Sequence, residues 1–181
     1  MTTNRYSVGN TNFHAGNLHS IHKLDTLGKK VSFDVDFYLN NKFADRYNNG
    51  ASLDANHSTI TDTYYANRNI TDGLATNYSA KIDVELPYKW GNISTGGKLS
   101  FSVNDNDYKV YDETTGTAVI DNDQTNKFKY TENNQALYLS FSKQLLENLN
   151  AQVGLRMENT YTEGYSETIN RTDKNNYLQL S

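Results

Sequence analysis

The feature that most constrains this chain is a strict alternation of apolar and polar residues over residues 149–161. One face of the expected strand is apolar and uncharged, and comprises Leu149, Ala151, Val153, Leu155, Met157 and Tyr161. The opposite face is polar and includes Arg156 and Glu158. A period of two is typical of a β-strand whose faces meet different environments. The sequence therefore predicts a wall between an oily side and a watery side.

The same division recurs along the chain and predicts an all-β fold. Clear alternation favours strands at residues 30–39, 78–86, 93–103 and 127–142. Residues 17–24 fit a strand less well because His19, Ser20 and His22 interrupt the apolar pattern. Pro87 ends one ladder because it has no N–H group. Gly96 and Gly97 indicate a bulge or a close approach of two segments.

The connections between these strands alternate between tight turns and long polar stretches. Turns are predicted at residues 26–29, 87–92 and 143–148, and long polar loops at 40–77, 104–126 and 162–175. Transmembrane barrels have this rhythm, with short periplasmic turns and long extracellular loops. We therefore predict an antiparallel up-and-down meander of about six to seven strands, a single segment of a transmembrane barrel covering residues 1–181. Aromatic residues near strand ends, namely Tyr88, Trp90, Phe128, Tyr130, Tyr161 and Tyr165, are candidates for interfacial girdles.

Composition narrows the function classes. Only 36% of the 181 residues are hydrophobic and the mean hydropathy is −0.79, so little apolar material is available for a core sealed on all sides. The chain has no cysteine, which excludes disulfides and thiol catalysis. A net charge of −4 without a basic cluster argues against nucleic acid as a partner. No signal peptide precedes the first polar residues, so we expect a piece of a longer chain.

A sequence motif points to a family. The motif comprises F-x-Y-x-E and A-x-Y, a short turn, and then G-L-R-x-E-x-T, at Phe128, Tyr130, Glu132, Ala136, Tyr138, Gly154, Leu155, Arg156, Glu158 and Thr160. In combination it resembles the barrel portion of TonB-dependent receptors of the Bacteroidetes type. Earlier stretches at residues 16–25, 28–37, 81–87 and 96–102 resemble the preceding strands and hairpin of that family. His19, Ser20 and His22 depart from the aromatic residues usual in the family's first strand.

The resemblance implies a bacterial outer-membrane barrel of about 22 strands, of which this chain is roughly a third. It further implies a lipid bilayer around the barrel, a plug domain elsewhere in the protein, and a TonB-type coupling protein as partner. The imported ligand would be a scarce nutrient of the siderophore, vitamin or glycan kind. We expect no catalytic activity and no cofactor, and we expect the three polar loops to contact the ligand.

Several side-chain groups deserve weighing as chemical sites. His14, His19 and His22 suggest a metal, but His19 and His22 would point to opposite faces of a strand, so surface histidines are the preferred interpretation. The carboxylates of Asp34, Asp36, Asp83 and Glu85 lie two apart in pairs, as in acid–base catalysis. No nucleophile accompanies them, so a hydrated polar face balanced by Lys81, Lys98 and Arg156 is favoured.

Two further groups are weaker signals. Residues 105–107 and 121–123 both read Asp-Asn-Asp, like fragments of a calcium loop, but lack its glycine and glutamate. Arg156 and Glu158 would share the polar face with Glu132 and Tyr138 across the hairpin. The four residues would form a structural ladder of ion pairs or, alternatively, be unrelated exposed charges. The sequence therefore predicts no metal, cofactor or catalytic residue.

One alternative remains open at this stage. A soluble β-sandwich or small β-barrel that binds glycan or lipid would show the same alternation, with its apolar face turned inward. If the membrane interpretation holds, an isolated segment exposes two sheet edges and its apolar face. We then expect such a segment to self-associate in water.

Overall fold

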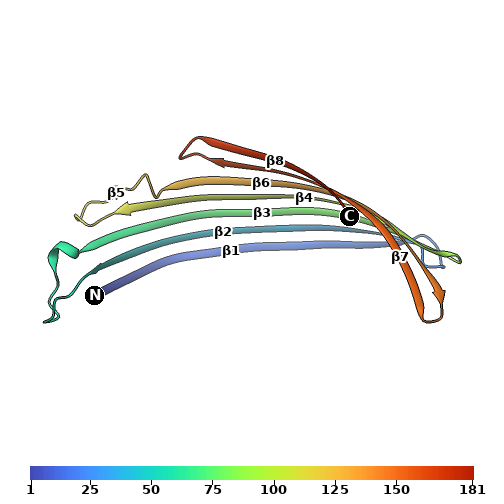
Figure 1. The fold of residues 1–181 in the computed structure, drawn as a ribbon, viewed down its shortest axis with the longest axis horizontal. Helices are drawn as coiled ribbons and strands as arrows, with labels where there is room; N and C mark the ends of the chain where they lie inside the picture. The colour runs from blue at the N-terminus through green and yellow to red at the C-terminus, as the bar shows by residue number, and fades with distance from the viewer.

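The structure is a computed structural model that describes residues 1–181 and consists of one curved antiparallel sheet (Figure 1). Seven long strands follow one another in the order β1-β2-β3-β4-β6-β7-β8, and the short β5 pairs with β4. The strands are β1 Thr2–Lys23, β2 Lys30–Ala51, β3 Tyr65–Tyr88, β4 Gly91–Asp112, β5 Val119–Ile120, β6 Asn126–Leu146, β7 Leu149–Ser166 and β8 Arg171–Leu180. The predicted all-β meander is confirmed.

The sheet is a single layer with nothing packed on either face. Only 9 of the 181 residues are buried, and the large side chains all retain solvent exposure. The strands are therefore held together by backbone hydrogen bonds, 115 of which lie within regular secondary structure, with no packed interior. A sandwich needs a second sheet, so the sandwich alternative is wrong for this chain. The only helix is the short 3₁₀ turn η1 at Thr61–Thr63, and no helix has the length and apolarity needed to cross a membrane.

The strands are much longer than their alternation indicates, which corrects the predicted loops. Within residues 40–77 only 52–64 lie outside β2 and β3, and the 104–126 stretch keeps only 113–118 and 121–125 outside strands. The third predicted loop, 162–175, contracts to the turn at 167–170 between β7 and β8. Where both faces of a strand meet water, the backbone hydrogen bonds between strands continue, but the sequence no longer alternates between apolar and polar residues. Polar composition was therefore misinterpreted as loop chemistry.

The first segment also differs from expectation. β1 extends from Thr2 to Lys23 and pairs with β2 along its whole length, so the region with the weakest pattern is fully extended. Its register places Leu18 opposite Val35 and His22 opposite Val31. Strand pairing compensates here for the poor alternation.

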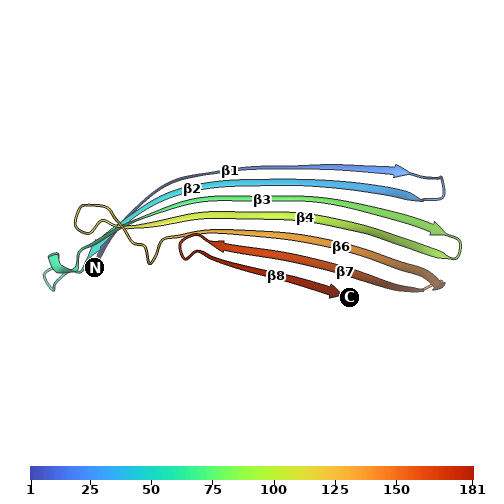
Figure 2. The same cartoon turned by 90° about the horizontal axis from the view of Figure 1, so that it is seen from above.

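The connections gather by length at the two ends of the sheet (Figure 2). The β1–β2, β3–β4 and β6–β7 turns lie at one end, and the last two leave only residues 89–90 and 147–148 outside the strands. The β2–β3 and β4–β6 connections lie at the other end. We call these the short-turn end and the loop end.

Asp25 organises the β1–β2 turn. Its Oδ1 accepts hydrogen bonds from the backbone N–H groups of Leu27 at 2.9 Å and Lys29 at 3.0 Å. Between them, Gly28 adopts a positive φ of 100°. The N–H of Lys29, followed by that of Leu27 and by the Lys29 ammonium, holds the pKa of the Asp25 carboxyl below its usual value. A lowered pKa means that the carboxylate stabilises the turn above the unfolded-state pKa. That contribution is lost as the pH falls through the lowered folded-state pKa.

We expect Asp25→Ala to speed amide hydrogen exchange at Leu27 and Lys29 by about two- to tenfold, because two N–H groups lose their acceptor. Exchange measured peptide by peptide by mass spectrometry checks this. The wild-type turn should approach the variant only at pH values below the lowered pKa of Asp25. Unchanged exchange in the variant would show that the carboxylate does not hold the turn.

Candidate functional site: the two faces of the wall

The cross-strand register gathers the apolar residues of six strands onto one face of the sheet. We call this set the apolar belt; it comprises Val31, Phe33, Val35, Phe37 and Leu39 of β2, Tyr78, Ala80, Ile82, Val84 and Leu86 of β3, Ile93, Leu99, Phe101 and Val103 of β4, Leu137, Leu139 and Phe141 of β6, Val153, Leu155 and Met157 of β7, and Leu178 and Leu180 of β8. The belt is contiguous across the sheet and contains no charge.

The belt is not a protein core. Leu155 is 73% exposed, Val153 66% and Leu99 60%, although each lies in the middle of a long strand. Val35 and Val84 are only half-buried and belong to the same single layer, so these valines do not converge in a sealed interior. A contiguous apolar surface of this kind marks contact with a membrane or another apolar partner.

The belt crosses the strands obliquely, as it must if the strands are tilted in a bilayer. Phe33 of β2 is connected to Met157 of β7 by one row of paired residues through Ile82, Gly97 and Leu137. The belt ends at Met157 in β7, where Asn159 follows on the same face, but continues to Leu39 in β2. Its edge is level at Leu39 in β2 and Val103 in β4, and lies six residues lower, at the level of Phe33, in β6 and β7. The mean shift is therefore six residues over the four steps from β2 to β7.

This mean shift agrees with tilted strands. Six residues over four steps is about 1.5 residues, or about 5 Å along the strand, for each inter-strand spacing of about 4.8 Å. The two lengths are nearly equal, so a level membrane boundary would require strands tilted by about 45°. Barrel strands are tilted by roughly 35–45°.

Aromatic residues border the belt at the short-turn end. Trp90 stacks between Tyr88 and Phe141, with ring centroids 5.3 and 5.7 Å apart, and Lys29 places its Nζ 5.0 Å from the Tyr88 ring centre. Amphipathic rings and a cation suit the interface between lipid and water. Tyr161 and Tyr165 share the face of the belt on β7.

The girdle prediction is wrong for two residues. Phe128 and Tyr130 lie at even positions of β6, which carry the polar side chains, so they point away from the belt. Tyr130 instead donates its hydroxyl to Glu132 at 2.9 Å. Proximity to a strand end was the signal for a girdle, but the residue's parity in the strand decides the face.

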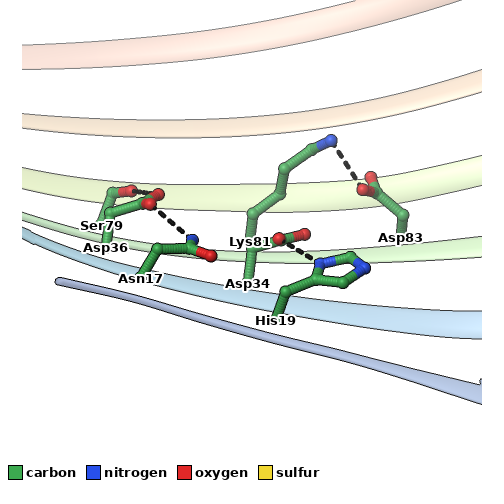
Figure 3. Close-up of polar contacts among 7 residues, drawn as sticks. All are labelled: Asn17, His19, Asp34, Asp36, Ser79, Lys81 and Asp83. Carbon is green, nitrogen blue, oxygen red and sulfur yellow. Dashed lines mark hydrogen bonds and ion pairs between the residues drawn. The ribbon is translucent and has the colours of Figure 1, made fainter.

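The opposite, polar face carries a network of paired side chains (Figure 3). Asp36 of β2 accepts hydrogen bonds from Asn17 of β1 at 2.8 Å and from the hydroxyl of Ser79 of β3 at 2.9 Å. His19 contacts Asp34 between β1 and β2. Side-chain contacts therefore join the same neighbouring strands that the backbone hydrogen bonds join.

A second group on this face centres on Asp83. Lys81 approaches Asp83 with Nζ and Oδ2 2.6 Å apart, and Tyr138 of β6 donates its hydroxyl to the same carboxylate. Gly96 of β4 lies between Asp83 and Tyr138 in the register, and its missing side chain leaves the space that the tyrosine crosses. The close approach predicted for this glycine pair is confirmed at Gly96, and the uninterrupted register shows no bulge there.

The third group contains the motif residues of β7. Arg156 forms an ion pair with Glu158, with Nη2 and Oε2 2.6 Å apart. Asn134 of β6 donates to Glu158 at 2.5 Å and to Thr160 at 2.8 Å. The predicted ladder is confirmed for Arg156 and Glu158, whereas Tyr138 contacts Asp83 and Glu132 accepts from Tyr130.

The carboxylates and histidines that were considered as catalytic or metal-binding residues do not come together in a single cluster in the structure. Asp34, Asp36 and Asp83 each have a different partner, and Glu85 pairs with Lys30 at 3.0 Å. This is the balanced polar face that the sequence favours over paired catalytic carboxylates. His14 and His22 lie on the belt side of β1, opposite Leu39 and Val31, while His19 lies on the polar side.

The calcium-loop fragments also separate. Asp105, Asn106 and Asp107 lie inside β4, where successive side chains alternate between faces. Asp121 uses its Oδ1 to accept the N–H groups of Asp123 and Gln124 at 3.0 and 3.1 Å, which is the chemistry of a turn. No cluster of three or more metal-ligating side chains is present.

Comparison with known families decides between the remaining interpretations of the belt. Residues 22–181 match the model of an outer membrane protein beta-barrel family. The chain belongs to this outer-membrane barrel family. No curated protein matches the sequence. The matched residues include every strand except β1, so the belt, the girdle and most of the polar network lie within the family's region.

Family membership orients the wall. The protein is located in the bacterial outer membrane, with the apolar belt against the acyl chains of the bilayer. The polar face then lines the lumen, where its paired charges remain hydrated. The short-turn end corresponds to the periplasm and the loop end to the exterior.

The Asp36 group provides a test of the lumen network. Asp36→Ala leaves the amide of Asn17 and the hydroxyl of buried Ser79 without their acceptor, so we expect a lower urea midpoint for unfolding from the membrane. Urea titration of the protein in lipid vesicles measures this. Ser32→Ala, on the same face of the same strand, is the control and should be near neutral. Equal effects of both substitutions would show that the network adds no stability.

Proposed function

We propose that this chain is part of the wall of a large TonB-dependent receptor that imports a scarce nutrient through the outer membrane. The observation that carries the proposal is the openness of the sheet. Seven long strands lie side by side, and β1 and β8 remain at opposite edges without pairing (Figure 2). An eight-stranded barrel would be nearly closed by this number of strands, so the open sheet supports a considerably larger complete barrel. Large barrels have lumens wide enough for a channel or a plug.

Two features support a receptor. The family-like motif G-L-R-x-E-x-T places Arg156 and Glu158 as an ion pair on the lumen wall. The strands continue well past the belt toward the loop end, so they raise the connections at 52–64 and 113–125 clear of the bilayer. These connections, together with the turn at 167–170, are the proposed sites of first ligand contact.

The wall itself is proposed to be non-catalytic. Its carboxylates are engaged in ion pairs and hydrogen bonds, and no nucleophile stands beside a base. Transport then needs energy from a TonB-type coupling protein that acts on other parts of the receptor. The side chains described here would hold a rigid hydrated lumen.

Uptake in cells tests this function. Cells that produce the full-length protein would be given a labelled panel of a ferric siderophore, cobalamin and oligosaccharides, with and without a protonophore. We expect one compound to bind in both conditions but to accumulate only in energised cells, and deletion of the gene to abolish both. Accumulation that persists with the protonophore would identify a passive pore and contradict the proposal, as would failure of all panel compounds to bind.

A further inference from the structure

A row of aromatic side chains crosses the outer face of the sheet near the loop end. Tyr6 of β1 pairs with Tyr47 of β2, Tyr47 with Arg68 of β3, and Arg68 with Tyr111 of β4. The register places all four on the same face as the belt, away from the lumen. Three inter-strand spacings make the row about 14 Å long. We call it the tyrosine row.

The tyrosine row lies above the hydrocarbon layer. Tyr47 is eight residues beyond Leu39 in β2, and Tyr111 is eight residues beyond Val103 in β4. Eight residues at about 3.3 Å, tilted by about 45°, give a height of about 19 Å above the end of the belt, and Tyr47 lies about 9 Å above the exposed Phe43 on the same face. The headgroup region on each side of a bilayer is only about 5–8 Å thick. A lipid can therefore reach the tyrosine row only with a long head group.

The surroundings of the row suit neutral, amphipathic rings. Arg68 binds Asp45 through two hydrogen bonds, from Nε to Oδ1 at 2.9 Å and from Nη2 to Oδ2 at 2.5 Å, so its charge is compensated. Lys109 is likewise paired with Asp107 at 2.9 Å. Because these two cations are already paired with carboxylates, this surface does not favour a bare phosphate. The exposed apolar side chains of Val8 and Phe43 lie nearby on the same face.

Sugars combine the features that this surface would recognise. The C–H face of a pyranose packs on an aromatic ring, while its hydroxyls exchange hydrogen bonds with the carboxylate, guanidinium and tyrosyl groups at its rim. Tyr6 is 66% exposed and offers its ring for such contact, and Tyr47 accepts a hydrogen bond from Asn49 at 3.3 Å. The row is about 14 Å long, which is enough for about two to three sugar units if each covers about one strand spacing.

We propose that the tyrosine row binds the oligosaccharide of a lipopolysaccharide molecule in the outer leaflet. The position supports this occupant, because this face is turned outward at a height that only the sugar chain of a membrane lipid reaches. This binding site is separate from the lumen and does not depend on the proposed import function. It would anchor the loop end of β1–β4 laterally in the carbohydrate layer.

Binding of lipopolysaccharide to the purified full-length protein in detergent tests the proposal. Wild-type protein should bind lipopolysaccharide with its full core sugars at least tenfold more tightly than lipid A, which lacks them. The triple variant Tyr6→Ser/Tyr47→Ser/Tyr111→Ser should lose roughly tenfold or more of that affinity, because three aromatic contacts disappear. Tyr165→Ser, on the same outer face of β7 but outside the row, is the matched control and should bind normally.

Three outcomes would overturn the proposal: equal affinity of the wild type for both lipids, unchanged binding by a folded triple variant, or equal loss in the control. The comparison of the two lipids needs no substitution, so it decides the question even if the triple variant fails to fold. Free core oligosaccharide should compete with the intact lipid. Competition by inorganic phosphate alone would instead indicate binding through lipid A phosphates and would also contradict the proposal.

Discussion

Leu155→Arg is expected to destabilise the protein folded in a bilayer by about 2–4 kcal/mol, which is the cost of a cation on the lipid face near the midplane. Leu155 is 73% exposed in the sheet, so in water an arginine at this site would cost nearly nothing. The large effect arises only if acyl chains surround the side chain. Urea titration of folding into phospholipid vesicles, followed by heat-modifiable migration in detergent gels, gives the value.

The matched control for this experiment is Gln152→Arg. Gln152 lies on the same strand three residues away, but its side chain is on the polar face that lines the lumen. We expect this variant to fold within about 0.5 kcal/mol of the wild type. If Leu155→Arg were as mild as the control, the belt would not face lipid.

Gly96→Ala is expected to disrupt assembly of the wall near the centre of the sheet. A Cβ at this position would lie 2.4 Å from the carbonyl oxygen of Ile82, 2.6 Å from the hydroxyl oxygen of Tyr138 and 2.7 Å from Oδ1 of Asp83. These distances are too short for real contacts, so Tyr138 must leave Asp83 and the backbone must shift. Overpacking of this kind costs about 1–3 kcal/mol, to which the loss of the Tyr138–Asp83 hydrogen bond adds.

Gly16→Ala provides the control because nothing lies within 4 Å of a Cβ built there. It should fold as well as the wild type, or slightly better, since alanine restricts the unfolded chain more than glycine. The yield of folded protein in outer membranes and its urea midpoint in vesicles compare the two variants. Equal stability of Gly96→Ala and Gly16→Ala would mean that the tyrosine does not cross the glycine.

The strands could be predicted where one face is apolar, and only there. The alternation at residues 30–39, 78–86 and 149–161 located the membrane-facing parts of β2, β3 and β7 correctly. The same strands continue for many more residues with polar side chains on both faces, and periodicity carries no information in that situation. The predicted loops at 40–77, 104–126 and 162–175 therefore contain pieces of strand, and the third of them is reduced to the short turn at 167–170.

The contacts of the candidate site could also be predicted only in part. The pairing of Arg156 with Glu158 was predictable because the two residues are neighbours on one face of one strand. The contacts of Asp36 with Ser79 and of Asp83 with Tyr138 join residues 43 and 55 positions apart. They depend on the register between strands. The hydrophobic pattern shows on which face a residue lies, but not which residue of the next strand lies opposite it. Most of the tyrosine row was missed because its residues lie in β1 and in the stretches assigned to loops.

Labelling of single cysteines in the membrane tests the central claim most directly. The chain contains no cysteine, so each residue from Gln152 to Glu158 can carry the only label in turn. In native outer membranes we predict that a water-soluble thiol reagent modifies the even positions and that a bilayer-confined reagent modifies Val153, Leu155 and Met157. Modification of those three positions by the water-soluble reagent alone, with protection of the even ones, would contradict the assignment of the belt to lipid.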